Sequence, residues 1–247
     1  MAIPAKETYV NYQQHYHNDA LEFDYWRKEK FSPTEIRRNQ SVYALCNIKK
    51  GAKVLDVGSG RGWFSLYAAK QGADVTALDL SEDNLQKIKA VDPRITTVYG
   101  DACDVPIKDT KYDLIVALEV MEHLVNPQAA LLNWESLLKP GATLLITVPY
   151  KETILYSLCI HCNKKTPYNA HLHSFDKAAL IKLLQESGYQ IKESHLFLHK
   201  LLTLLRINGI TKRLPFCIWK HLDRLCALFG DKYSFIGIKA SLKPDKS

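Results

Sequence analysis

The chain has 247 residues, of which 47% are hydrophobic, so it can bury a substantial core without disulfides or a structural metal. The charged fraction of 24% is ordinary for a folded protein and argues against extensive disorder. The net charge of +7 permits nucleic acid or an anionic membrane surface as a partner but requires neither.

The beginning of the chain shows no secretory signal. Residues 1–17 are polar and aromatic and lack the apolar stretch of a leader, which favours a cytoplasmic protein with reduced cysteines. No run of about 18 apolar residues occurs, so we expect no membrane-spanning helix.

Strands and helices are predicted to alternate over the first two thirds of the chain. We expect residues 1–50 to form a helical cover with a helix over 33–45, because Pro33 suits the first turn of a helix. Beyond it, short apolar runs that stop at glycine or proline predict strands, and runs with helical spacing predict helices. The expected strands are 53–57, 74–80, 95–99, 112–118 and 142–148, and the expected helices are 63–70, 82–90 and 127–138.

This alternation predicts a doubly wound α/β fold, a mostly parallel sheet with helices on both faces. Residues 150–174 break the rhythm and are expected to form an irregular insertion. A helix over 177–187 and strands over 190–197 and 233–242 then complete a seven-stranded sheet. We therefore expect a single domain in which residues 51–149 form the cofactor-binding core, since such sheets bind ligands at the carboxyl ends of their strands.

Three closely spaced glycines, Gly58, Gly60 and Gly62, follow the first core strand. Glycines there permit a tight turn and let a ligand lie against the backbone, with free N–H groups from the helix behind them. The spacing differs from the G-x-G-x-x-G loop of dinucleotide-binding folds, and Asp56 precedes the loop. A carboxylate at that place would repel a pyrophosphate but can orient an amino group. This suits the methionine end of S-adenosylmethionine, which carries an ammonium and a sulfonium.

Acidic residues also follow the next two strands. Asp79 stands at the tip of the second strand, where a ribose diol would be held. Asp101 follows the third strand and could accept a hydrogen bond from an adenine amino group, while Leu80 and Ala102 pack against the ring. Either acid alone could be a turn or capping residue, but their order at successive strand ends indicates a nucleoside site.

Taken together, four motifs resemble those of class I S-adenosylmethionine-dependent methyltransferases, of the subgroup that acts mainly on small molecules. The resemblance is strong over residues 50–150 and looser over 170–197. The motifs are 56–62, 79–80, 100–102 and 119–124.

The resemblance implies S-adenosylmethionine as the cofactor and assigns a part of it to each motif. Asp79 would bind the ribose hydroxyls, and Asp101 with Ala102 the adenine. Arg37 or Arg38 could reach the carboxylate of the methionine moiety from the N-terminal helix, or be an exposed charge. The remaining residues implied for the methionine moiety are Asp56, Gly58, Ser59, Gly60 and Glu119.

Two histidines are the candidate catalytic residues. Methyl transfer needs the acceptor held in line and about 3 Å from the methyl group, and a hydroxyl acceptor also needs a base. His123 follows the fourth strand, beside the expected ligand, and is the candidate base; His173 is the second candidate. The alternative for His123 is capping or packing of the next helix.

The sequence also leaves two metal sites open as alternatives, and we commit to neither. The spacing of Glu119, Glu122 and His123, with His173 later in the chain, is similar to that of metal-dependent ubiquinone O-methyltransferases and plant small-RNA 2′-O-methyltransferases. The resemblance implies a divalent cation that would polarise paired oxygens of a diol.

A zinc site in the insertion is the second metal alternative. Cys159 and Cys162 have the spacing of a zinc knuckle, and His171 and His173 follow them closely enough to complete four ligands. Both metal alternatives use His173, so at most one of them can hold.

Residues 198–230 combine positive charge with leucines. Six basic residues stand against one acid, and an apolar stripe at helical spacing follows. One interpretation is a helical insertion that covers the sheet or forms a homodimer. The other is an amphipathic lid that touches the inner face of a membrane. The stripe is Ile218, Leu222, Leu225 and Phe229.

The function expected from these features is methyl transfer to a small, perhaps hydrophobic, metabolite, more readily at oxygen than at nitrogen or carbon. One alternative is an RNA-modifying 2′-O-methyltransferase, although the positive charge is interleaved with leucines and no RNA-binding module is visible. Another is a non-catalytic protein that binds S-adenosylmethionine, against which the intact glycine loop and Asp79 argue.

Overall fold

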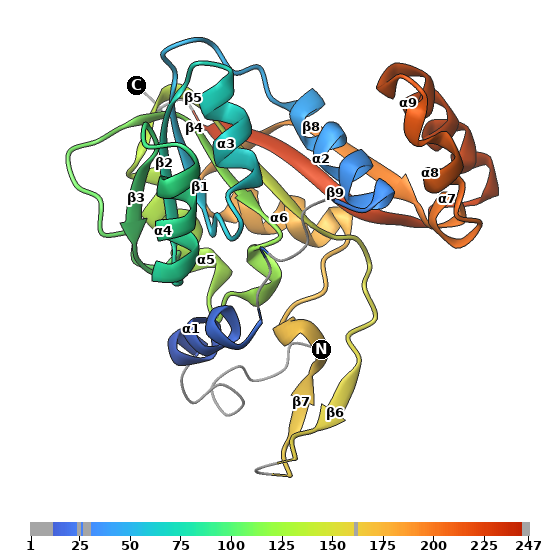
Figure 1. The fold of residues 1–247 in the computed structure, drawn as a ribbon, viewed down its shortest axis with the longest axis horizontal. Helices are drawn as coiled ribbons and strands as arrows, with labels where there is room; N and C mark the ends of the chain where they lie inside the picture. The colour runs from blue at the N-terminus through green and yellow to red at the C-terminus, as the bar shows by residue number, and fades with distance from the viewer. Residues whose placement is uncertain (1–11, 24–25, 27–30, 161–162, 244–247) are drawn as a thin grey trace.

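The computed structural model describes residues 12–23, 26, 31–160 and 163–243. At its centre lies a seven-stranded sheet in the order β3-β2-β1-β4-β5-β9-β8 (Figure 1). The first five strands of this order run parallel, and β9 runs antiparallel to β5 and β8. The predicted doubly wound sheet is therefore confirmed. Its strands are β1 (Lys53–Val57), β2 (Asp74–Asp79), β3 (Thr96–Tyr99), β4 (Tyr112–Leu118), β5 (Leu138–Pro149), β8 (Tyr189–His199) and β9 (Tyr233–Leu242).

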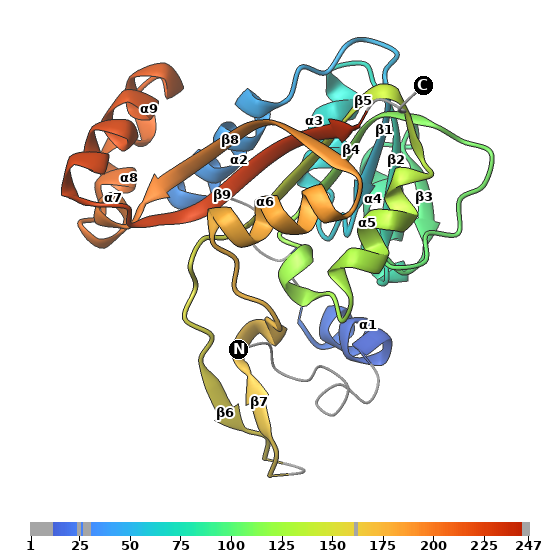
Figure 2. The same cartoon turned by 180° about the vertical axis from the view of Figure 1, so that it is seen from behind.

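Helices cover both faces of the sheet (Figures 1 and 2). Because side chains alternate across a strand, each strand feeds two cores: Val54 of β1 packs toward one face and Leu55 toward the other. One face is covered by α2 (Pro33–Leu45), α3 (Trp63–Lys70) and α4 (Glu82–Val91), and the other by α5 (Pro127–Glu135) and α6 (Lys177–Glu186).

The predicted elements of the sheet and its covering helices lie within two residues of the observed ones, with two exceptions that adjoin each other. The helix expected over 127–138 ends at Glu135, and β5 begins at Leu138 rather than at residue 142. Leu138 pairs with Tyr112 across an irregularity in the register of β4 and β5. A bulge of this kind accommodates Pro140, which lacks the N–H group that a regular ladder needs.

Three segments lie outside this layered body. The helix α1 (Tyr12–Glu22) lies across the carboxyl ends of the parallel strands (Figure 1). The insertion 150–174 is less irregular than expected, because it contains a hairpin of β6 (Tyr156–Leu158) and β7 (Lys165–Pro167) that projects from the body.

The third segment connects β8 to β9 through α7 (Lys200–Leu204), α8 (Ile207–Ile210) and α9 (Phe216–Leu225). We call residues 198–230 the lobe; it lies at the end of the molecule, beyond the antiparallel strands (Figure 1). In the described part of the chain, no helix has both the length and the apolar character needed to cross a bilayer.

Candidate active site

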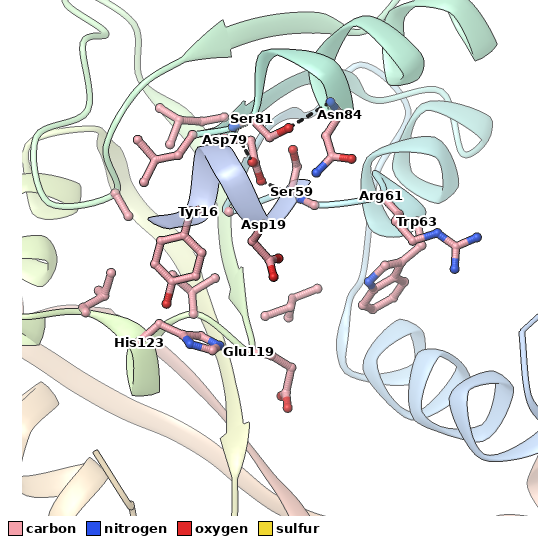
Figure 3. A pocket seen from close by; sticks show the side chains of 18 of the residues that line it. Tyr16, Asp19, Ser59, Arg61, Trp63, Asp79, Ser81, Asn84, Glu119 and His123 are labelled. Atoms are coloured by element: carbon pink, nitrogen blue, oxygen red, sulfur yellow. Dashed lines mark hydrogen bonds between the residues drawn. The ribbon is translucent and has the colours of Figure 1, made fainter. Parts of the chain in front are cut away.

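A cavity of about 470 Å³ lies at the carboxyl ends of β1, β2, β3 and β4, between α1 and α2 (Figure 3). Its volume suits a small organic ligand. The cavity brings together nine of the eleven site residues predicted from the sequence; Asp56 and His173 are not among those that line it. The nine are Gly58, Ser59, Gly60, Asp79, Leu80, Asp101, Ala102, Glu119 and His123.

The glycines of the loop after β1 serve different purposes. All three have positive φ, which favours glycine. A Cβ atom on Gly58 would lie 2.6 Å from a Val120 methyl, and one on Gly62 would lie 2.5 Å from Ile88, so both positions need glycine for packing. A Cβ on Gly60 would meet nothing within 4 Å. Gly60 therefore leaves its backbone open to whatever occupies the cavity.

Asp79 presents a fixed carboxylate at the tip of β2. The backbone N–H of Gly60 donates to Oδ2 at 2.7 Å, and that of Ser81 donates to Oδ1 at 2.8 Å. Burial raises the pKa of Asp79, and these backbone hydrogen bonds oppose the rise. The side chain lines the cavity beside Asn84 (Figure 3).

Asp101 joins the end of β3 to α1. The backbone N–H of Cys103 donates to Oδ1 at 2.8 Å. Oδ2 accepts hydrogen bonds from the Tyr12 hydroxyl and, at 3.0 Å, from Gln13 Nε2. Burial and the neighbouring carboxylate of Asp101 raise the pKa of Tyr12, so its hydroxyl keeps the proton that it donates. The first described helix is thus attached to the cavity rim by the acid predicted to bind adenine.

Glu119 occupies a strained position directly after β4. Its φ is 59°, in the left-handed region that a non-glycine residue rarely adopts. Its backbone N–H donates to Thr147 O at 2.9 Å, and the Thr147 hydroxyl donates to Oε1 at 2.8 Å. Burial raises the pKa of Glu119 to about 7, and the positive charge of Arg38 opposes the rise. Glu119 can therefore hold or release a proton near neutral pH.

The structure separates the two arginines that the sequence left as alternatives. Arg38 lines the cavity, and its guanidinium lies 5.8 Å from the ring centre of Trp63. Arg37 is buried on the opposite side of α2 and donates to the carbonyl oxygens of Thr211 and Leu214 in the lobe. Only Arg38 can meet a ligand in the cavity.

Two predicted site residues lie behind the cavity wall. Asp56 is 2% exposed and accepts a 2.6 Å hydrogen bond from the Ser65 hydroxyl, and burial raises its pKa to about 7. His173 Nε2 lies 2.8 Å from the carbonyl oxygen of Leu124, to which it can donate. Both side chains thus bond to neighbours behind the wall, and their contact with a ligand or acceptor stays a prediction.

A group of potential metal ligands lies at the rim, where His123 meets the insertion. The ligand atoms of Glu122, His123 and His171 all lie within 4.8 Å of one another. Glu122 is 1% exposed, and neither of its carboxylate oxygens has a hydrogen-bond partner among the residues that the structure describes. Two imidazoles and a carboxylate form a known ligand set for a divalent cation such as Zn²⁺. The second histidine of this group is therefore His171, whereas the metal site considered from the sequence had His173.

Burial favours the uncharged forms of the side chains in this group. Burial raises the pKa of Glu122, and the charge of Glu119 adds to the rise. Burial, with a smaller effect of His171, lowers the pKa of His123 to about 4, so its imidazole is neutral at neutral pH. The ring of His171 lies 4.7 Å from that of His123, centre to centre, and its Nδ1 pairs with Glu152.

The alternative zinc site does not assemble from its described members. Cys162 lies outside the described residues. Within the described ranges, Cys159, His171 and His173 do not form a cluster of ligand atoms. His171 instead faces His123, and His173 bonds to Leu124 O.

Sequence reasoning missed part of the cavity wall. Tyr16 and Asp19 of α1 line it, and the Tyr16 ring stands edge-on to His123 at 5.8 Å (Figure 3). Trp63 and Arg61 line the side nearest α3. Trp63 directly follows the glycine loop, so its position was a signal that could have been used. Nothing local in the sequence indicates that α1 folds across the strand ends.

Comparisons with known proteins identify the family. The sequence matches the family described as "Methyltransferase domain" over residues 23–194, more than half of the chain. A probable S-adenosylmethionine-dependent methyltransferase of Mycolicibacterium smegmatis is 27% identical over 161 residues, covering 64% of this chain and 60% of the relative. A ubiquinone biosynthesis O-methyltransferase of Xanthomonas campestris pv. campestris is 34% identical over 118 residues, covering 44% of this chain and 48% of the relative. The matches thus span about half to three fifths of these curated relatives.

Solved structures agree with the fold. A crystal structure of an S-adenosylmethionine-dependent methyltransferase from Mesorhizobium loti superposes with a TM-score of 0.60 at 17% identity. The superposition covers 83% of this chain and 97% of that one, so it shows a common fold. The strand order, the family match and this likeness together place the chain in the class I S-adenosylmethionine-dependent methyltransferase family.

Proposed function

We propose that the protein transfers the methyl group of S-adenosylmethionine to an oxygen atom of a small, apolar acceptor. The assembly of the predicted nucleoside-binding residues around one cavity carries this proposal. Apolar side chains of Leu118, Val120 and Leu124 share the wall with the polar groups, which favours an acceptor with an apolar part. Several relatives are named ubiquinone biosynthesis O-methyltransferases, which agrees with oxygen as the acceptor atom.

The strand-end acids would hold the nucleoside half of the donor. The Asp79 carboxylate, which the backbone N–H groups of Gly60 and Ser81 hold in place, would accept hydrogen bonds from the ribose hydroxyls. Leu80 and Ala102 would pack against the adenine ring, and Asp101 would accept from its amino group. The open backbone at Gly60 lets the ligand approach closely.

Opposite charges would hold the methionine half. The Glu119 carboxylate would pair with the ammonium group, and the Arg38 guanidinium with the carboxylate. Asp56 becomes a positioning residue in this proposal, because its bond to Ser65 ties β1 to the first turn of α3 behind the glycine loop. When bound, S-adenosylmethionine supplies a methyl group attached to a positively charged sulfur. The sulfur leaves readily, because it becomes a neutral thioether.

His123 can serve the acceptor in two ways. As a neutral imidazole on the cavity wall, it would take the proton of an acceptor hydroxyl. Alternatively, His123 would join Glu122 and His171 in holding a divalent cation, which would lower the pKa of that hydroxyl. The carboxylate of Glu122 has no hydrogen-bond partner among the described residues, and this favours the role of His123 as a metal ligand.

Calorimetric titration with S-adenosylmethionine tests the donor site. Asp79→Ala should weaken binding by about 1.5–3 kcal/mol, the scale of a lost charged hydrogen bond. Asp74→Ala is the matched control, because it removes an exposed carboxylate from the opposite end of the same strand. Equal affinities of Asp79→Ala and wild type would contradict the ribose assignment.

The role of His123 is tested by comparing two variants. His123→Ala should lower turnover on phenol and catechol acceptors while S-adenosylmethionine affinity stays the same. If His123 acts as a base without a metal, a chelator should leave wild-type turnover unchanged, and Zn²⁺ titrated into the apoprotein should not bind. If His123 is a metal ligand, Zn²⁺ should bind to wild type and His171→Ala should abolish that binding.

The acceptor class is tested separately, by comparing RNA with small phenols as substrates. Methylation of RNA in preference to small phenols would contradict the acceptor class.

A further inference from the structure

The apolar stripe of α9 faces outward from the protein. Ile218 and Leu225 are 48% and 59% exposed, and Phe229, in the short turn that follows α9, is 69% exposed, whereas Leu222 is partly buried. The residues that face the body are Trp219 and Asp223, which are 0% and 3% exposed. The body-facing side of α9 is thus only partly apolar, and the helix leaves large apolar side chains in water that would usually pack on the core.

Specific contacts fix α9 in this orientation. Trp219 Nε1 donates to the side chain of Asn208 at 3.0 Å, and the guanidinium of Arg37 lies 5.2 Å from the centre of the Trp219 ring. Asp223 accepts the backbone N–H groups of Leu198 and His199 at 3.1 and 2.7 Å. Rolling α9 to bury its stripe would break these buried contacts, so the outward stripe is a stable feature of the fold.

Exposed apolar side chains extend over the whole lobe. Leu204 is 79% exposed, Ile210 is 81% and Leu228 is 83%, all more exposed than any residue of the stripe. A concentration of exposed apolar residues in one segment marks a surface that contacts something else.

The charge of the lobe has one sign. Asp223 is the only acidic residue between positions 198 and 230, and it is buried on backbone N–H groups. Within the lobe the exposed charged groups are therefore basic, and the next acid along the chain, Asp231, is already paired with Tyr150 and Lys151. These basic residues are Lys200, Arg206, Lys212, Arg213 and Arg224, with Lys220 half-buried.

We propose that the lobe docks on the surface of an anionic lipid bilayer. The outward apolar side chains would enter the boundary between headgroups and acyl chains, and the basic residues would lie against anionic headgroups.

Other occupants fit this surface less well. A second copy of the chain fits less well, because a symmetric contact would place positive charge against positive charge. Single-stranded RNA fits less well, because Trp219 is buried and stacking platforms need exposed aromatics. The proposal does not depend on the acceptor of the methyl group.

Flotation with phospholipid vesicles tests the docking surface. The protein should float with vesicles of equal parts phosphatidylglycerol and phosphatidylcholine, and should not float with phosphatidylcholine alone. Binding should weaken as salt is added, because the charges on both surfaces are exposed. Equal binding to the two vesicle types, or no binding to either, would overturn the proposal.

Two pairs of variants distinguish the effect of the basic residues of the lobe from the effect of the net charge of the protein. Lys212→Ala with Arg213→Ala should weaken vesicle binding about thirty-fold, since each basic residue near an anionic surface contributes a factor of about five. Lys49→Ala with Lys50→Ala, an exposed basic pair outside the lobe, should leave binding unchanged. Equal losses in the two pairs would show that net charge alone drives binding and would overturn the proposal.

The apolar contribution has its own matched pair. Ile218→Ser with Leu225→Ser should abolish flotation, whereas Val91→Ser with Leu132→Ser, on α4 and α5, should not. Two further results would also overturn the proposal. One is a dimer in analytical ultracentrifugation that the Ile218→Ser, Leu225→Ser variant dissociates. The other is an affinity for single-stranded RNA that exceeds the affinity for the anionic vesicles.

Discussion

The cavity and the lobe depart from ordinary burial in opposite directions. Around the cavity, carboxylates are removed from water: Asp56 is 2% and Glu122 is 1% exposed. In the lobe, apolar side chains such as Ile210 and Leu228 remain largely in water. Burying a charge and exposing apolar area both oppose folding, so each arrangement indicates an interaction that folding alone does not satisfy. Our proposals assign the methyl donor to the cavity and an extended lipid surface to the lobe.

One helix connects the two regions. Ser32 and Glu35 form a reciprocal capping box that fixes the start of α2. Further along the same helix, Arg37 reaches the lobe through Thr211 O, while its neighbour Arg38 lines the cavity. Because consecutive residues point to different sides of a helix, a single rigid element positions one arginine in each region.

The largest expected effect in this comparison concerns the buried carboxyl of Asp56. Burial raises its folded-state pKa to about 7 from an ordinary value of 3.8. The folded state therefore holds a proton that the unfolded state has released, and the free energy of unfolding should fall as pH rises from about 4 to about 7. The total loss from this group is roughly 4 kcal/mol, after which the curve levels off.

Asp56→Asn should remove this dependence, because the amide keeps an acceptor for Ser65 and carries no charge. Urea unfolding at several pH values measures the slope. Asp74→Asn, on an exposed carboxyl, provides the matched control. Other buried carboxyls, such as Glu119, keep their share of the slope in this variant. A slope in Asp56→Asn as steep as that of wild type would mean that Asp56 is ionised in the fold throughout this range.

The anchor of the lobe should show the next largest effect. Asp223→Ala leaves the backbone N–H groups of Leu198 and His199 without their acceptor, and should lower the free energy of unfolding by about 2–3 kcal/mol. Hydrogen exchange should speed up at these two amides more than at the amides of β1. Unchanged exchange there would show that other groups hold the lobe.

The sequence predicted the cavity better than the lobe for a physical reason. In a parallel sheet the carboxyl ends of successive strands meet at one edge, so Asp79, Asp101 and Glu119 come together wherever the strand order is known. The role of α1 could not be predicted, since the contact between Tyr12 and Asp101 joins residues 89 apart in sequence. In the lobe, the spacing of the stripe predicted a helix but not which side of it faces the body.

Residue spacing alone also could not decide where two smaller groups of the site lie, the histidines of the insertion and Asp56. His171 and His173 are equivalent in spacing, and only the path of the insertion after the hairpin decides that His171 meets His123 while His173 bonds to Leu124. Asp56 was predicted to contact the ligand because it precedes the glycine loop. Its side chain is bonded to Ser65 of α3 and is not among the residues that line the cavity, so its contact with the ligand stays a prediction.

A smaller effect should appear in the pH dependence of donor binding. Burial raises the pKa of Glu119 to about 7, so its carboxylate is lost as pH falls through that value. If the carboxylate pairs with the ammonium of S-adenosylmethionine, affinity should fall about five-fold between pH 7 and pH 6. Calorimetry should show this fall in wild type and a flat, weaker profile in Glu119→Gln. A fall of equal size in the variant would assign the titration to another group.

The smallest expected effect is on stability, at the outward stripe. Because Ile218 and Leu225 are 48% and 59% exposed, replacing both by serine removes little buried area, and the free energy of unfolding should change by about 0.5 kcal/mol or less. Trp219→Ala, one position from Ile218 but fully buried, should instead cost about 3–5 kcal/mol. Urea unfolding without lipid measures both. A loss above about 2 kcal/mol for the double serine variant would mean that the stripe is covered in the folded protein. In that case vesicle binding by the lobe would require α9 to open first. The lobe would then not be an exposed docking surface, and it would no longer contrast with the cavity.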